Sequence, residues 1–202
     1  FAALTISKSL PKNTGTVIVK HANPCGVSIK KNHLESYKSA FACDPVSAFG
    51  GIVSCNFKIT KVLALELSKI FLEVIIANNF DIKALKILKK KKNLRLIDAS
   101  NYKVNDGLKY LSVNNEILIQ SEDTKKFTFK DFKIVSKRKP TSKEIKNLIF
   151  AFNVCRYVKS NAIVLAANET TAGIGSGQPS RLDSCKIAID KMKKFTNLNE
   201  NL

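Results

Sequence analysis

The chain has 202 residues, of which 45% are hydrophobic, and its 34 lysines and arginines against 16 acidic residues give a formal net charge of +18. This hydrophobic content argues against a disordered chain, and no apolar run approaches the roughly 20 residues that a membrane helix needs. Only four of the basic residues are arginines, the side chain best suited to base edges and phosphates, so the charge alone is weak evidence for a nucleic-acid partner.

Strands and helices alternate through the first half of the chain. The run "TVIVKHA" (16–22) predicts a buried strand, which Pro24 and Gly26 are expected to end in a loop. Further strands are predicted at 52–55, 73–77 and 94–98, and helices at 33–44, 60–71 and 81–92. This alternation predicts an α/β layer architecture.

The pattern weakens between residues 99 and 133, where the turn residues Asn105, Asp106 and Gly107 precede two alternating runs, "EILIQ" and "KFTFKDF". We interpret this segment as a linker or excursion between subdomains. A helix is predicted at 142–160 and a strand at 162–167, and a glycine-rich loop at 171–181 leads into a last helix from about Leu182.

Lys20 and His21 stand at the end of the first predicted strand. An α/β fold presents catalytic groups where strands end in loops, and a neutral imidazole suits proton abstraction. A neighbouring ammonium would keep that imidazole neutral and stabilise developing negative charge. The alternative is an exposed polar pair without function. The second histidine, His33, precedes a predicted helix and is expected to have a surface or capping role.

Three more stretches carry candidate binding groups. In "DPVSAFGGI" (44–52), Gly50 and Gly51 suit either a turn or a wall that a planar ligand approaches closely. Asn161 in "VKSNAIV" can cap backbone groups or orient an amide or formyl oxygen. The stretch "GIGSGQPSR" fails the G-x-G-x-x-G spacing and has no G-K-[ST], but its Arg181 can clamp a carboxylate or phosphate.

The cysteines indicate a cytoplasmic protein with reduced thiols. All five are widely spaced, and no C-x-x-C occurs, so neither a disulfide framework nor a zinc knuckle is predicted. The N-terminal residues lack the features of a signal peptide. Because the chain starts at Phe1 and stops in "KKFTNLNENL", we expect a fragment of a longer protein.

Two other classes of protein fit the sequence less well. A zinc deaminase needs H-x-E and P-C-x-x-C, but His21 is followed by Ala22 and Asn23, and Cys25 by "GVS", so no metal site is predicted. A lysine-rich nucleic-acid-binding module would need an aromatic or arginine platform. The chain has no tryptophan, and its "KKKK" run is more simply a solvated helix end.

Taken in order, seven segments resemble the AICAR transformylase part of the family of bifunctional purine biosynthesis proteins, AICAR transformylase/IMP cyclohydrolase. The matching segments are "VKHANPCGV", "DPVSAFGGIVS", "FLEVIIA", "KKNLRLI", "SKRKPT", "VKSNAIV" and "GIGSGQPSR". They are collinear and cover nearly all of the chain. One departure is Pro179, where the family pattern has Met or Gln.

The resemblance implies formyl transfer from 10-formyltetrahydrofolate, the co-substrate, to the 5-amino group of AICAR, giving FAICAR. It implies that His21 is the base, that Lys20 stabilises charge at the reaction centre, and that Asn161 hydrogen-bonds the reacting groups. The remaining implied contacts to substrate and folate come from Phe49, Gly50, Glu73 and Arg181.

The resemblance also implies an architecture of two cytidine-deaminase-like α/β/α subdomains. Residues 1–125 would form the first, incomplete at its N-terminus and with the excursion at about 99–125, and 126–202 the start of a truncated second. Active sites between the subunits of a homodimer are implied, with no nucleic-acid or membrane partner. A cyclohydrolase domain with an Arg-Tyr-Gly stretch is expected before this chain, and "SDAFFPF" and "PGGS" type motifs after it. We therefore expect activity of the full-length protein and none of this piece alone.

Overall fold

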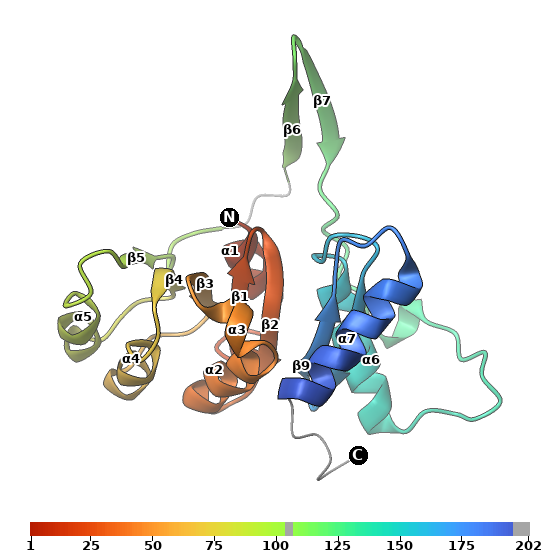
Figure 1. The fold of residues 1–202 in the computed structure, drawn as a ribbon, viewed down its shortest axis with the longest axis horizontal. Coiled ribbons are helices and arrows are strands. Elements are labelled where there is room, and N and C mark those ends of the chain that lie inside the picture. The colour runs from red at the N-terminus through yellow and green to blue at the C-terminus, as the bar shows by residue number, and fades with distance from the viewer. Residues whose placement is uncertain (104–106, 196–202) are drawn as a thin grey trace.

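A computed structural model describes residues 1–103 and 107–195. Among these residues, one mixed sheet has the strand order β5-β4-β3-β1-β2-β9-β8 (Figure 1). Its strands are β1 (Gly15–Lys20), β2 (Asn23–Ile29), β3 (Gly51–Cys55), β4 (Leu72–Ala77), β5 (Arg95–Asp98), β8 (Ile163–Ala167) and β9 (Thr170–Gly175). The helices are α1 (Ala2–Ser9), α2 (His33–Ala42), α3 (Pro45–Ala48), α4 (Lys61–Leu67), α5 (Ile82–Leu88), α6 (Ser142–Cys155) and α7 (Arg181–Phe195).

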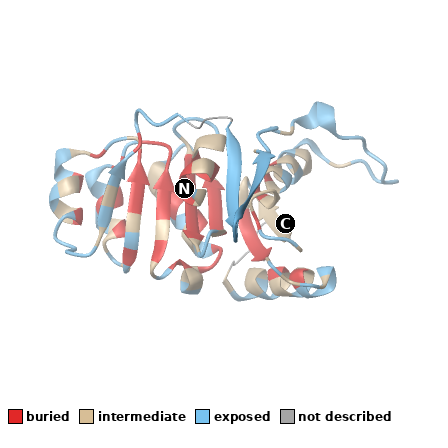
Figure 2. Ribbon diagram, turned by 90° about the horizontal axis from the view of Figure 1, so that it is seen from above, coloured by how far each residue is buried: buried red, intermediate tan, exposed pale blue. Residues whose placement is uncertain are grey.

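The predicted α/β architecture is confirmed, with helices flanking a seven-stranded sheet. Only β3, β4 and β5 run parallel to one another, whereas β1, β2, β9 and β8 pair antiparallel. The central strands are the most buried part of the molecule (Figure 2). In the described part of the chain, we find no helix long and apolar enough to span a membrane.

The loop predicted around Pro24 and Gly26 is wrong, because these residues belong to β2, which pairs antiparallel with β1. The register shifts between Ile18 and Val19, which lie opposite Gly26 and Pro24, and a bulge is one of the places where a sheet tolerates proline. Gly26 has a packing role. A Cβ there would overlap the carbonyl oxygen of Ala40 in α2 and lie 2.8 Å from its carbonyl carbon.

The prediction of a glycine-rich loop at 171–181 is wrong for its first part, which belongs to β9, the strand next to the edge strand β8. Gly173 and Gly175 lie directly under α7. A Cβ on either glycine would overlap a backbone carbonyl oxygen of that helix, at Ala188 and Ser184 respectively. These glycines therefore allow a helix backbone to lie against a strand, which a phosphate-loop pattern does not predict.

Helix α1 was not expected, and it covers the sheet near β1 and β3. Its buried residues Ala3, Leu4 and Ile6 enter a cluster with Val17 and Val19 of β1. The helix is also held by a polar contact, because the hydroxyls of Ser7 and Ser54 are 2.7 Å apart. This helix therefore completes the core on the face of the sheet where α6 also packs.

The weakly patterned region forms a hairpin of β6 (Leu108–Val113) and β7 (Glu116–Ser121), which projects from the body (Figure 1). Every residue of both strands is exposed, as Figure 2 shows. The run "EILIQ" is thus a strand, whereas "KFTFKDF" contains a single 3₁₀ turn at Phe129–Asp131. The turn predicted at Asn105 and Asp106 lies outside the described residues.

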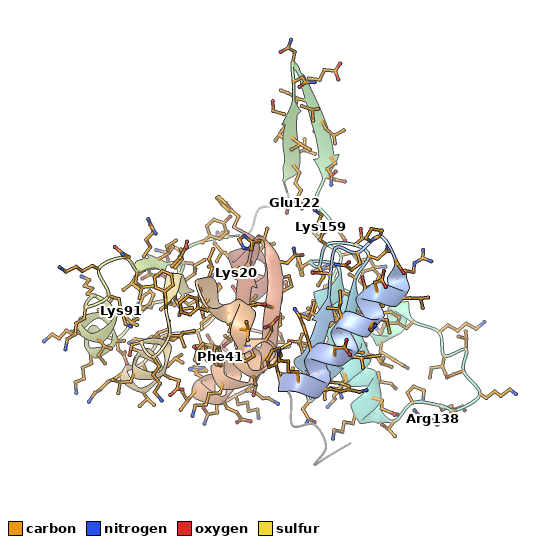
Figure 3. The ribbon with its side chains drawn as sticks, in the orientation of Figure 1. Lys20, Phe41, Lys91, Glu122, Arg138 and Lys159 are labelled. Atoms are coloured by element: carbon orange, nitrogen blue, oxygen red, sulfur yellow. The ribbon has the colours of Figure 1, made fainter. Side chains whose placement is uncertain are left out.

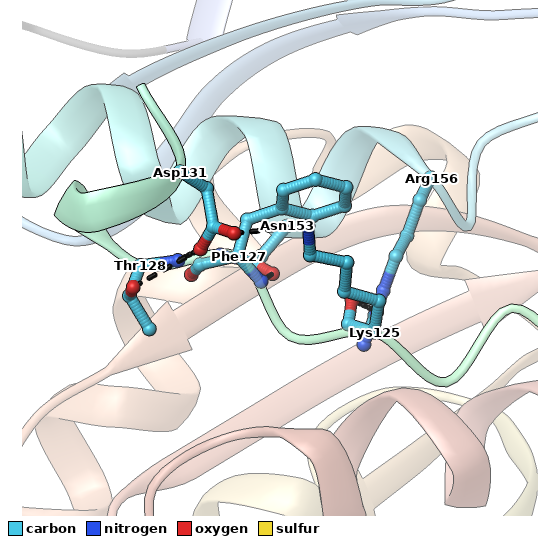
Figure 4. Close-up of polar contacts among 6 residues, drawn as sticks. All are labelled: Lys125, Phe127, Thr128, Asp131, Asn153 and Arg156. Atoms are coloured by element: carbon cyan, nitrogen blue, oxygen red, sulfur yellow. Dashed lines mark hydrogen bonds and ion pairs between the residues drawn. The ribbon is translucent and has the colours of Figure 1, made fainter. Parts of the chain in front are cut away.

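Residues 122–133 form a strap across α6, shown in Figure 4. The side chain of Asn153 accepts a hydrogen bond from Phe127 N (3.0 Å) and donates one to Phe127 O (2.8 Å). Within the strap, the Asp131 carboxylate accepts hydrogen bonds from Thr128 N and the Thr128 hydroxyl and pairs with Lys125. These contacts, the bond from Thr128 N most of all and then that from Lys125, lower the pKa of Asp131 to about 2. The strap is therefore ordered by side-chain contacts with α6 and within itself.

An ion pair ties α7 to the first part of the chain. Lys191 Nζ lies 2.7 Å from Asp44 Oδ2, and the Asp44 side chain is only 3% exposed. Burial by itself raises the pKa of this carboxyl, but the hydrogen bonds from Lys191 and from Ser47 outweigh burial and lower it. Asp44 is therefore charged at neutral pH and anchors both α3 and α7.

We expect this pair to make stability depend on pH. A carboxyl whose pKa is lower in the folded chain stabilises it above the unfolded pKa, about 3.9 for Asp, and this is lost as pH falls through the folded pKa. Asp44→Asn should lower the free energy of unfolding by about 2 kcal/mol at pH 7 and by less at pH 2. Urea titrations at both pH values measure this. Asp190→Asn, at an exposed neighbour of Lys191, is the control; an equal loss at both pH values would exclude the ion pair as the cause.

Candidate functional site

The ends of six strands lie side by side at one end of the sheet. We call this row of strand ends the site edge, which is distinct from the edge strands β5 and β8. Because β1 is antiparallel to β2 and β3, the carboxyl end of β1 lies beside the amino ends of those two strands. By the same pairing, the amino ends of β4 and β8 and the carboxyl end of β9 lie at this edge. It contains all the candidate residues: Lys20, His21, Phe49, Gly50, Glu73, Asn161 and Arg181. The expectation that carboxyl ends of strands present the site therefore holds only for β1 and β9, because the sheet is mixed.

A two-residue hairpin turn between β1 and β2 presents His21. His21 and Ala22 have φ values of +50° and +63°, the left-handed pair typical of a type I′ turn, and Lys20 pairs with Asn23 across it. His21 is exposed, whereas Lys20 is half-buried. The strand and its turn therefore hold the imidazole at the tip of a tight hairpin, directly after Lys20.

Lys20 joins the hairpin to the segment before β3. Its Nζ donates a hydrogen bond to the Phe49 carbonyl oxygen at 2.5 Å. Gly50 has φ +68° and its N–H donates to Phe71 O at 2.9 Å; a Cβ on Gly50 would lie 3.6 Å from both Lys20 Nζ and the Phe71 ring. Glycine tolerates this left-handed backbone conformation. Because it also has no side chain, it leaves open space beside the Lys20 ammonium.

Phe49 and Phe71 form an exposed aromatic pair beside Lys20. Their ring centroids are 5.5 Å apart at 48°, and the two residues are 58% and 44% exposed. Large apolar side chains in such contact with water are typical of a ligand surface. Phe71 was missed in the sequence analysis, although an aromatic residue at the end of a predicted helix, two residues before a predicted strand, was a signal for it.

The side-chain amide of Asn161 is hydrogen-bonded to the loop before α7. Its Nδ2 donates to the carbonyl oxygens of Gln178 (2.9 Å) and Pro179 (2.7 Å), and its backbone N–H also donates to Gln178 O. Both amide hydrogens are therefore used, and Oδ1 remains as the group that can accept a hydrogen bond. The substituted residue Pro179 takes part only through its carbonyl oxygen, which any residue would supply.

Glu73 and Arg181 lie at the same edge. Gly51 is opposite Leu72 and Ile52 is opposite Val74, so Glu73 is the extra residue of a bulge and is exposed. Arg181 is the exposed first residue of α7. Within residues 1–103 and 107–195, neither side chain forms a hydrogen bond or an ion pair with Lys20, His21 or Asn161.

Asn23 and Lys159 connect the two parts of the site, and neither was among the predicted site residues. Asn23 Oδ1 accepts a hydrogen bond from the Lys159 N–H at 2.9 Å, and Lys159 O accepts one from Gly177 N at 2.7 Å. Figure 3 shows Lys20 and Lys159 toward the same side of the body. The available signal was that both residues lie next to predicted site residues, Asn23 in "HAN" after His21 and Lys159 in "VKS" before Asn161.

The cysteine beside the hairpin is not a nucleophile at neutral pH. Cys25 is 8% exposed, and burial, with smaller contributions from nearby charges, raises the pKa of its thiol to about 12. Among the residues that the structure describes, no three His, Cys, Asp or Glu side chains are placed to hold a metal ion together. The groups at this edge that suit acid–base chemistry include the imidazole of His21, the ammonium of Lys20 and the amide oxygen of Asn161.

Fold and site together define an α/β domain with a candidate acid–base site along one edge of a mixed sheet. The family model described as "AICARFT/IMPCHase bienzyme" matches residues 1–191, and the chain belongs to this family.

Curated relatives bear the name "Bifunctional purine biosynthesis protein PurH". The chain is 46% identical over 199 residues to that of Buchnera aphidicola subsp. Schizaphis graminum, covering 98% of this chain and 38% of the relative. It is 44% identical over 196 residues to that of Persephonella marina, covering 96% and 38%. It is 48% identical over 176 residues to that of Parvibaculum lavamentivorans, covering 86% and 33%. The chain thus spans little more than a third of the length of these relatives.

Proposed function

We propose that this chain carries part of the site for formyl transfer from 10-formyltetrahydrofolate to the 5-amino group of AICAR. The observation that carries the proposal is the hairpin that holds His21 at its tip while Lys20 binds the Phe49 carbonyl (2.5 Å). Membership of the AICARFT/IMPCHase family supports the transformylase rather than a new chemistry. The activity belongs to the full-length protein, in which further chain completes the site.

In the proposed reaction the amine nitrogen attacks the formyl carbon, and a new C–N bond forms. The amine is a weak nucleophile, because its lone pair is conjugated with the imidazole carboxamide. His21 takes the proton that the amine loses, which leaves the nitrogen neutral in the product. The bond from the formyl carbon to the folate nitrogen then breaks. The proton that His21 took passes to that nitrogen as tetrahydrofolate leaves, which restores the neutral base.

Lys20 supplies positive charge beside the reacting atoms. The tetrahedral intermediate carries negative charge on the former formyl oxygen, and an ammonium fixed by the Phe49 carbonyl would stabilise it. Base and electrostatic stabiliser are thereby held in adjacent positions of one strand end.

Asn161 has a narrower role than the sequence analysis expected. With both amide hydrogens bound to carbonyl oxygens of residues 178 and 179, it has only Oδ1 to offer. We propose that Oδ1 accepts a hydrogen bond from the attacking amine and so orients its lone pair toward the formyl carbon. Donation to the formyl oxygen then belongs to Lys20 or to groups outside this chain.

The other candidates are assigned to binding. Phe49 and Gly50 would border the substrate base, because an exposed ring and a position without a side chain admit a planar ligand. Glu73 is assigned to the nucleotide and Arg181 to a folate carboxylate, for which a guanidinium is well suited. The pair Phe49–Phe71 adds apolar surface at the same place.

We further propose the architecture that the resemblance implies: two cytidine-deaminase-like subdomains at 1–125 and 126–202, in a cytoplasmic homodimer with active sites between subunits. The contacts between β2 and β9 would then join the two subdomains. The anionic nucleotide and folate also suit a chain with a net charge of +18.

Lys20→Met in the full-length protein tests the electrostatic part of the proposal. We expect kcat for FAICAR formation to fall about 10²-fold, the size of effect for one lost donor to a developing oxyanion. Lys31→Met is the matched control, because Lys31 is exposed and lies beyond the other end of β2. Wild-type protein that makes no FAICAR would contradict the proposed function, and Lys20→Met with full activity would contradict the role of Lys20.

A further inference from the structure

The two parts of the site lie on strands that are barely paired with each other. Among the residues that the structure describes, Ser28 and Thr170 are the one pair in register between β2 and β9. At the next position, the hydroxyl of Thr171 takes the place of a backbone partner for Val27. It accepts a hydrogen bond from Val27 N (2.9 Å) and donates one to Val27 O (3.2 Å). At this position the two strands are therefore joined through the Thr171 side chain.

At the site edge, Asn23 supplies the polar bridge. Its Oδ1 accepts from Lys159 N at 2.9 Å, and Asn23 itself pairs with Lys20 across the hairpin turn. On the other side, Lys159 O binds Gly177 N (2.7 Å), and Asn161, two residues on, binds the loop at 178–179. One side-chain oxygen thus joins the hairpin of Lys20 and His21 to the segment that holds Asn161.

We propose that Asn23 is a positioning residue that sets the distance between His21 and Asn161. This inference rests on the proposed function, in which the imidazole and the amide oxygen act on the same amine. Asn23 need not touch the substrate. Its effect is geometric, because misplacing catalytic groups by about 1 Å can lower a rate by up to about 10²-fold.

A purely local role predicts a different result. The turn itself depends on the left-handed residues His21 and Ala22 and on the backbone pairing of Lys20 with Asn23, none of which uses the Asn23 side chain. A turn residue would thus tolerate any side chain of similar size. A positioning residue requires an acceptor at Oδ1, which aspartate retains and leucine lacks.

The test compares Asn23→Asp and Asn23→Leu with wild type in the full-length protein. We expect Asn23→Leu to lower kcat for FAICAR formation about tenfold with KM for AICAR changed less than about twofold, and Asn23→Asp to retain most of the activity. Hydrogen exchange of the Lys159 amide should become faster in Asn23→Leu and stay near wild type in Asn23→Asp. Thr171→Val removes the other bridge and serves as the control, with a lower melting temperature and an unchanged kcat.

Three results would overturn the inference. They are unchanged kcat in Asn23→Leu, equal losses in both variants, and unchanged exchange of the Lys159 amide in Asn23→Leu. Wild-type protein without formyl transfer would instead overturn the proposed function, and the positioning role with it. The two outcomes can be told apart, because a failure of the Asn23 inference alone is seen only when the wild-type protein is active.

Discussion

Replacing His21 by alanine in the full-length protein is expected to lower kcat for FAICAR formation by about 10²- to 10⁴-fold, the range for loss of a general base. His21 is held at the tip of the β1–β2 hairpin, and its removal leaves the backbone pairs of that hairpin in place. The folded structure should therefore persist, with an unchanged melting temperature. Steady-state formation of FAICAR by wild type and variant measures the effect.

The second histidine provides a matched control. His33 Nε2 lies 2.9 Å from Asn13 O, and its ring stacks on Phe57 with centroids 3.8 Å apart. It follows β2 at the opposite edge of the sheet, so His33→Ala should lower the melting temperature while leaving kcat near wild type. If His21→Ala keeps most of its activity, His21 is a structural turn residue and the assigned base is wrong, even if formyl transfer itself is observed.

Gly175→Ala is expected to lower the free energy of unfolding by about 3 kcal/mol or more, the upper part of the range for overpacked sites. The added Cβ would overlap Ser184 O and lie 2.7 Å from its carbonyl carbon. Both atoms belong to the backbone of α7, so the whole helix would have to move away from β9. Urea-induced unfolding followed by circular dichroism measures the change.

Gly177→Ala separates close packing from backbone conformation. Gly177 has φ +69°, and a Cβ there would meet only the Lys159 side chain, at 3.9 Å. We expect a loss of about 1 kcal/mol, from the left-handed conformation alone. If both variants lose equally little, α7 is free to shift on β9, and the interpretation of Gly175 as a close-packing residue fails.

The strand and helix pattern was largely readable from the sequence. Strands β1, β3, β4, β5 and β8 and helices α2, α4, α5, α6 and α7 occur within a few residues of their predicted positions, because each presents an apolar face with the period of its element. The pattern failed at β2 and β9, where proline and glycine were interpreted as loop signals. In both strands the glycines are required by a helix lying on top, and such a neighbour is invisible to local periodicity.

Periodicity predicted the α/β class, and the ordered motifs predicted the family and the candidate residues. The mixed sheet, in which strand ends of both polarities bring these candidates to one edge, became visible only once the strands were paired in space. The tertiary structure also decided what the candidates can do: the amide hydrogens of Asn161 are bound to the loop at 178–179, and Asn23 bridges to Lys159. The physical reason is that strand pairing and side-chain hydrogen bonds join residues more than a hundred positions apart, whereas periodicity and motifs act over one element at a time.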